Sequence, residues 1–114
     1  MQIDNIIKRD STRKPFQQVK ITDAILKAMI SVDNGEPEDA EKISSSVFNA
    51  LIERKQSIPN YVPNIEEIQD LVEQKLMQSE FLDVAKSYIL YRNIQQQKRK
   101  RMVREMKTMM SEAN

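Results

Sequence analysis

Apolar residues recur at helical spacing over most of this chain, and that pattern limits its fold more than any other feature. From residue 21 onward, one face of a predicted helix carries Ile21, Ile25, Ala28, Met29 and Val32. The lone glycine, Gly35, can take the left-handed conformation that closes this helix, and Pro37 suits the first position of the next. The helical part of the chain is therefore expected to begin near residue 21 and to turn at residues 33–35.

Three more helices are predicted in the remaining sequence. The second runs from about residue 38 to residue 54, and its expected inward face comprises Ala40, Ile43, Val47, Ala50, Leu51 and Arg54. The third starts after a capping-box pattern of Asn64 and Glu67; it is expected to bury Ile65, Ile68, Leu71, Val72 and Leu76, with Glu66, Asp70 and Glu73 outward. The fourth follows a break at residues 78–80 and is expected to bury Phe81, Val84, Ala85, Tyr88, Ile89 and Tyr91.

The segment before residue 21 predicts a β-hairpin. Residues 2–8 suit a strand, and Pro15 is expected at the start of the return strand, with Phe16 and Val19 each offering an apolar side chain to the core. Residues 56–63 contain two prolines and are expected to be extended, so they can add a third strand. The predicted fold class is α+β, a four-helix bundle lidded by a short two- or three-stranded sheet.

The tip of this hairpin is unusually basic. Four cations and one anion fall within seven residues, from Lys8 to Lys14, and Lys20 follows where the strand meets the helix. If the hairpin lies over the helix end, then Lys8, Arg9 and Lys20 converge, and converging cations beside backbone N–H groups suit a polyphosphate. The alternative is a solvated hairpin tip with ordinary surface charge.

The composition excludes several function classes. A chain of 114 residues supports one domain with a modest core, and its net charge of +1 gives no overall attraction to nucleic acid or an acidic membrane. The absence of His and Cys excludes zinc sites, disulfides and thiol or imidazole catalysis, and a single glycine excludes glycine-rich phosphate loops. The polar opening and the lack of an 18-residue apolar run predict a cytoplasmic protein with no membrane partner. Enzyme activity is the least expected class.

Residues 96–114 differ in composition from the rest. A basic run from Lys98 to Arg101 is followed by Met102, Met106 and Met109 at helical spacing. This tail can continue the fourth helix as an exposed rod, contact nucleic-acid phosphates, or offer a soft apolar stripe to a partner helix. It can also be a charged linker to a segment outside this chain.

Taken together, four motifs resemble the ATP-cone family. They are the tip Lys8-Arg9-Asp10, the helix start Lys20-Ile21, the run Ile68-Gln69-Asp70-Leu71-Val72-Glu73 and the segment from Val84 to Arg92. The likeness covers about residues 2–95, so it divides the chain into a cone, 1–95, and a basic, Met-containing tail, 96–114. The resemblance implies a helical bundle under a short sheet that binds ATP or dATP as an allosteric effector. In that family the cone usually stands at the N-terminus of a ribonucleotide reductase. The residues of the last two motifs look most like those of cones from anaerobic ribonucleoside-triphosphate reductases.

The resemblance also assigns roles to single residues. Lys8 and Arg9 would grip the phosphates, and Lys20 would reach them from the helix side. The positions that enclose the base in the family are occupied by Ile6, Phe16, Gln17 and Ile21. Asn64 would contact ribose or a phosphate, Arg92 would lie near the phosphates, and Mg²⁺ would be held mainly by phosphate oxygens and water. Three features depart from the family pattern. Ser11 replaces a usual glycine, Lys14 stands where an acidic residue is common, and residues 59–63 look like a small insertion.

The leading hypothesis is a regulatory adenine-nucleotide-binding domain without catalysis of its own. Its expected partner is the catalytic domain or subunit of a ribonucleotide reductase, with a possible nucleotide-dependent oligomer. The alternative is a nucleic-acid-binding or transcriptional regulator that uses the basic segment from Lys98 to Arg104, although nucleic acid is the less expected partner. A third hypothesis is a helical adaptor that binds a partner through its methionine stripe.

Overall fold

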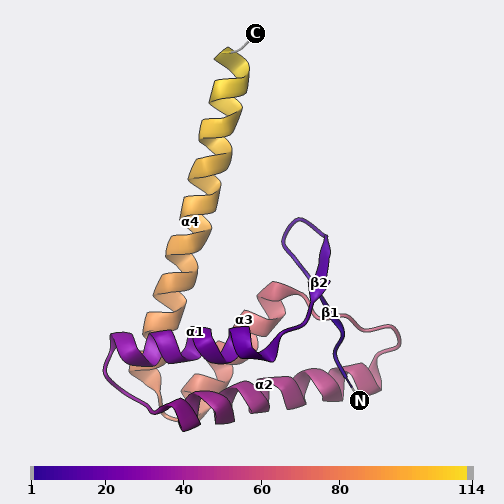
Figure 1. The fold of residues 1–114 in the computed structure, drawn as a ribbon, viewed down its shortest axis with the longest axis vertical. Helices are drawn as coiled ribbons and strands as arrows, with labels where there is room; N and C mark the ends of the chain where they lie inside the picture. The colour runs from indigo at the N-terminus through magenta and orange to yellow at the C-terminus, as the bar shows by residue number, and fades with distance from the viewer. Residues whose placement is uncertain (1, 113–114) are drawn as a thin grey trace.

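The computed structural model describes residues 2–112 and contains a β-hairpin followed by four helices (Figure 1). In chain order the elements are β1 (Asn5–Ile7), β2 (Arg13–Pro15), α1 (Gln18–Ser31), α2 (Pro37–Ser57), α3 (Ile65–Gln78) and α4 (Leu82–Glu112). The two strands form one antiparallel sheet in which Ile6 pairs with Lys14. The predicted α+β class, four helices with a hairpin sheet, is confirmed.

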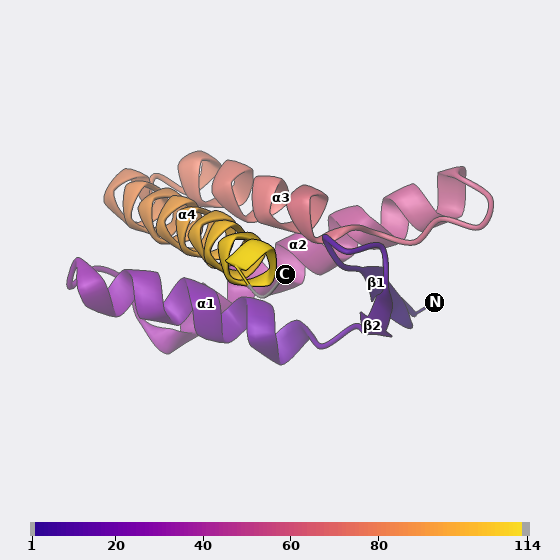
Figure 2. The ribbon, with the colours of Figure 1, turned by 90° about the horizontal axis from the view of Figure 1, so that it is seen from above.

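The four helices pack against one another, and the hairpin lies at one end of the bundle. Seen from above, the lower part of α4 lies between α1 and α3, and the hairpin lies beside the start of α1 (Figure 2). The hairpin and the free end of α4 rise from the same side of the bundle (Figure 1).

A single hydrophobic core joins the four helices to the N-terminal segment. Most side chains predicted to point inward are buried, and Ile3 joins them from the segment before β1. The buried hydrophobic residues are Ile3, Ile25, Ala28, Met29, Ala40, Ile43, Val47, Leu51, Ile68, Leu71, Val72, Leu76, Val84, Ala85 and Tyr88. The core thus fixes the base of α4 and the root of the hairpin in one rigid frame.

The predicted helix boundaries are largely correct. Pro37 is the first residue of α2, and at the start of α3 the Oδ1 of Asn64 accepts a hydrogen bond of 2.8 Å from the Glu67 N–H. The Glu67 carboxylate in turn accepts from the Asn64 N–H, which completes the capping box. The start of α1 was placed too late, because α1 begins at Gln18. Lys20 therefore lies in the first turn of α1 and not at the junction.

Gly35 takes the positive φ that the sequence predicts, +100°. A Cβ at this position would lie 2.6 Å from the Sδ of Met29, which is buried. We expect Gly35→Ala to lower the free energy of unfolding by about 1–2 kcal/mol, mainly through the backbone strain. Urea unfolding measures this loss, with Asn49→Ala on the exposed face of α2 as the control. An unchanged stability of Gly35→Ala would contradict the account of this turn.

Three details of the N-terminal region differ from the predictions. Pro15 ends β2, where it pairs with Asn5, so it does not start the return strand. Val19 is 62% exposed and adds nothing to the core, because α1 has already begun and turns this side chain outward. Residues 56–63 form no full strand; one parallel bridge joins Ile7 to Asn64, and the Ile7 N–H donates to the Pro63 carbonyl at 2.9 Å.

The basic tail continues α4 as the predicted exposed rod, up to Glu112. Tyr91, which was expected to be buried, is 58% exposed because it lies at the edge of the bundle where α4 begins to leave it. The division at residue 95 stays a prediction, since α4 runs through it without interruption. Within residues 2–112, no helix combines the length and the apolar character needed to cross a membrane.

Candidate functional site

Three lysines gather where the hairpin meets α1. Ile6 pairs with Lys14, and the Lys8 N–H donates to the Thr12 carbonyl, so Lys8 and Lys14 are diagonal neighbours on one face of the hairpin. The nearby Lys8 side chain, followed by the charges of Lys8 and Lys20, lowers the pKa of Lys14. Lys8, Lys14 and Lys20 are called the lysine cluster below. The hairpin register creates it, and sequence spacing alone gave no signal for Lys14.

The positive charge of the lysine cluster is not neutralised by an ion pair within residues 2–112. Asp10 is the nearby anion, but its carboxylate accepts hydrogen bonds from the Thr12 hydroxyl at 2.6 Å and the Thr12 N–H at 3.0 Å. These bonds, with a smaller effect of Lys8, lower the pKa of Asp10 and keep it charged within the turn. The turn also requires a positive φ of 71° at Ser11, as expected where a glycine is usual. The cluster is therefore suited to an external polyanion.

Arg9 points away from the lysine cluster toward α3. Its Nε lies 3.1 Å from Oε1 of Glu66, and its Nη2 donates to Oε1 of Gln69 at 3.1 Å. Of the three cations predicted to converge, Lys8 and Lys20 both lie close enough to Lys14 to lower its pKa, whereas Arg9 is held on α3. The predicted role of Arg9 in gripping phosphates stays a prediction.

Arg92 lies at the centre of a carboxylate group on α3. Its guanidinium bonds Glu66 and Glu73 at 2.6 Å and Asp70 at 2.9 Å, and its side chain is only 16% exposed. Burial acts to lower the pKa of Arg92, but the bonds to Glu66, Glu73 and Asp70 outweigh it and raise that pKa. Arg92, Glu66, Asp70 and Glu73 form the Arg92 cluster. The sequence pattern predicts that all three carboxylates face outward, yet the Glu73 side chain is only 20% exposed.

The residues predicted to enclose a base lie around the hairpin root. Ile6, Phe16 and Ile21 are partly buried against the core, and the Phe16 ring lies 5.8 Å from that of Phe48. Gln17 is exposed at the N-cap position of α1. Asn64 lies beside Ile7, with its Oδ1 already engaged in the cap of α3. These positions provide an apolar wall next to the lysine cluster, and their contact with a base stays a prediction.

A groove between α1 and α4 adjoins Lys20. It has a volume of about 400 Å³ and combines apolar, aromatic and charged side chains. Its lining residues are Lys20, Asp23, Ala24, Lys27, Ala28, Ser31, Ser87, Tyr88 and Tyr91. The apolar spacing of α4 predicts Tyr88 and Tyr91 in the core and therefore gives no signal for this groove. Its shape and composition suit a planar, partly apolar group.

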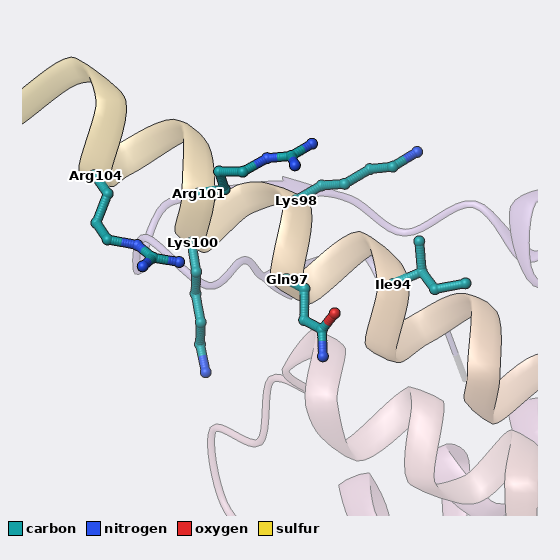
Figure 3. Close-up of a pocket in the computed structure, with 6 residues that line it drawn as sticks. All are labelled: Ile94, Gln97, Lys98, Lys100, Arg101 and Arg104. Carbon is teal, nitrogen blue, oxygen red and sulfur yellow. The ribbon is translucent and has the colours of Figure 1, made fainter.

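The cations on the free part of α4 do not converge on one point. Figure 3 shows Lys98 and Arg101 pointing to one side of the helix and Lys100 and Arg104 to the other. They line an open hollow together with Ile94 and Gln97. Nucleic-acid binding through this segment stays a prediction, which a mobility shift that disappears after removal of residues 96–114 would support.

Comparisons with known proteins identify a family and several longer relatives. The profile of the ATP cone domain family matches residues 4–97. The chain is 45% identical over 113 residues to a vitamin B12-dependent ribonucleoside-diphosphate reductase of Thermoplasma acidophilum, covering 95% of this chain and 13% of the relative. It is 32% identical over 112 residues to an anaerobic ribonucleoside-triphosphate reductase of Haemophilus influenzae, covering 96% and 15%. A ribonucleoside-diphosphate reductase subunit alpha of Chlamydia pneumoniae is 35% identical over 91 residues, covering 76% and 9%.

These relatives are much longer than the chain itself. The chain spans only 13% and 15% of the first two, so the matches concern one part of each relative. The similarity of the sequence motifs to those of anaerobic ribonucleoside-triphosphate reductases agrees with the match to the Haemophilus influenzae protein.

Proposed function

The chain belongs to the ATP-cone domain family, and on that premise we propose that it binds ATP and dATP as an allosteric regulatory domain. ATP-cone domains of ribonucleotide reductases are nucleotide-binding regulatory modules that respond to ATP or dATP. Regulation requires that the two nucleotides stabilise different conformations or assemblies to different extents. The domain carries out no catalytic step by itself.

The lysine cluster is the observation that carries this proposal. Lys8, Lys14 and Lys20 reach one region from two elements, and no described anion forms an ion pair with them. A triphosphate supplies the negative charge that this region lacks, and the first turn of α1 adds free backbone N–H groups. The adenine would lie against Ile6, Phe16 and Ile21, with Gln17, Asn64 and Arg92 at the margin of the site.

A Mg²⁺ ion is expected to accompany the triphosphate. No group of three acidic side chains among residues 2–112 is arranged to hold a metal. In this proposal the ion therefore keeps phosphate oxygens and water as its ligands. Its role is to neutralise phosphate charge that the lysines do not reach.

We propose that α4 connects the nucleotide site to a catalytic domain or subunit of a reductase. Its free part carries five exposed apolar side chains within nine residues, at spacings that place them on one side of the helix: Met102, Val103, Met106, Met109 and Met110. Methionine side chains adapt to varied surfaces. A nucleotide-dependent oligomer formed through the same stripe is the other arrangement that this surface can support.

Calorimetric titration with ATP, dATP and GTP tests the proposal. We expect ATP and dATP to bind and GTP to bind more weakly, because guanine carries more polar groups than adenine and the apolar wall offers them no hydrogen-bond partners. The protein should also melt at a higher temperature with saturating ATP, since a ligand that binds only the native state stabilises it. Failure of both adenine nucleotides to bind at millimolar concentration would refute the proposal.

Lys14→Gln should lower ATP affinity without lowering the stability of the protein. The nearby Lys8 and Lys20 side chains lower the pKa of Lys14, so the charged form of Lys14 is disfavoured in the folded protein. Replacing Lys14 by an uncharged residue should therefore not reduce the stability of the protein at pH 7. ATP affinity should fall by about three- to tenfold, because glutamine loses the positive charge but can still donate a hydrogen bond to a phosphate oxygen. Calorimetry and thermal melting measure the two effects, with Lys42→Gln on α2 as the control. A decrease in stability without a change in affinity would contradict a phosphate-binding role.

A further inference from the structure

Arg9 and Glu66 connect the hairpin tip to the two helices beside it. Arg9 follows Lys8 of the lysine cluster, yet its guanidinium is bound to α3 through Glu66 and Gln69, both at 3.1 Å. The other oxygen of Glu66 bonds Arg92 of α4 at 2.6 Å. Glu66 therefore bonds one cation from the hairpin and one from α4 at the same time.

The contact between Arg9 and Glu66 is exchangeable. The Glu66 side chain is 49% exposed and that of Arg9 is 28% exposed, so water reaches both groups. Solvent-exposed ion pairs are weak, whereas a triphosphate offers several charged oxygens that suit the planar fork of a guanidinium. Arg9 can leave Glu66 for a stronger anion by rotation of its own side chain, because the bond joins only side-chain atoms.

We propose that Glu66 competes with the bound nucleotide for Arg9, and that a triphosphate takes the guanidinium away from Glu66 when it binds. The inference rests on the proposed function and adds a mechanism to it. Glu66 then acts as a positioning residue that touches no nucleotide: it holds Arg9 on α3 in the free protein and lowers the affinity for the triphosphate.

The exchange also gives nucleotide binding a physical route to α4. With Arg9 on the triphosphate, the side-chain contacts between the hairpin tip and α3 are lost, and Glu66 keeps only its bond to Arg92. Because linkage is reciprocal, a contact on α4 that alters how Glu66 is shared between Arg9 and Arg92 should change nucleotide affinity in turn. The proposed effector site and the exposed rod of α4 are thus connected through one carboxylate.

The test uses Glu66→Gln, which keeps the shape of the side chain but removes its charge. Arg92 retains Asp70 and Glu73, so the variant is expected to fold. The variant should bind ATP about two- to fivefold more tightly than the unmodified protein in calorimetry. Asp70→Asn is the matched control: it removes the same charge from the same helix and touches Arg92 but not Arg9. Its ATP affinity should stay unchanged.

A second background separates competition from a general charge effect. In an Arg9→Gln protein, which should bind ATP more weakly, adding Glu66→Gln should leave the affinity unchanged because the competing pair is already gone. The inference is overturned if Glu66→Gln fails to tighten binding, if Asp70→Asn tightens it equally, or if the effect persists without Arg9. Complete absence of ATP binding by the unmodified protein would instead refute the proposed function, and this inference with it.

Discussion

Lys20→Ala is expected to weaken ATP binding by about tenfold to a hundredfold, since a hydrogen bond between charged groups contributes about 1.5–3 kcal/mol. Lys20 stands in the first turn of α1, beside Lys14 and on the rim of the groove between α1 and α4. Lys8→Ala on the opposite side of the lysine cluster should have an effect of the same order. Calorimetric titration with ATP measures both. Because Lys20 is exposed, thermal stability without nucleotide should hardly change.

Two control variants sharpen this test. Lys42→Ala on the exposed part of α2 should leave ATP affinity unchanged. The second control is Lys27→Ala. Lys27 lies two turns further along α1 than Lys20, within the groove and away from the hairpin. An effect of Lys27→Ala greater than that of Lys20→Ala would place the phosphates in the groove and would contradict a triphosphate site at the lysine cluster.

Arg92→Leu is expected to lower the free energy of unfolding by about 2–3 kcal/mol. The change leaves Glu66, Asp70 and Glu73 close together without their shared cation, and removing one partner of a covered ion pair is costly. The value lies below that of a fully buried pair, because the Glu66 side chain is 49% exposed and that of Asp70 is 68% exposed. Urea unfolding at pH 7 measures the loss.

Arg99→Leu on the exposed part of α4 is the control, and its stability should stay within about 0.5 kcal/mol of the unmodified protein. An Arg92→Leu protein that unfolds like this control would show that the cluster does not support the packing of α3 on α4.

Much of the fold follows from local signals in the sequence. The helix faces follow from the spacing of apolar residues, the start of α3 from Asn64 and Glu67, and the turn after α1 from Gly35. Each of these signals acts over a few residues, so the sequence displays it directly. The start of α1 was missed because Gln17 carries no capping side-chain bond, and Val19 was assigned to the core for the same reason.

The candidate site depends on contacts that the sequence does not display. Lys14 joins Lys8 only through the register of the hairpin, in which Lys14 pairs with Ile6. Arg9 meets Gln69 across 60 positions of the chain, and Arg92 meets Glu66 across 26. Helical spacing predicts that such carboxylates share one face of α3, but tertiary packing decides which cations cover that face.

The most direct measurement is a crystal structure of the protein grown with dATP and Mg²⁺. The account predicts the triphosphate within hydrogen-bond distance of Lys8, Lys14 and Lys20, with Arg9 moved from Glu66 toward the phosphates. A triphosphate bound along Lys98 to Arg104, with the lysine cluster untouched, would contradict it.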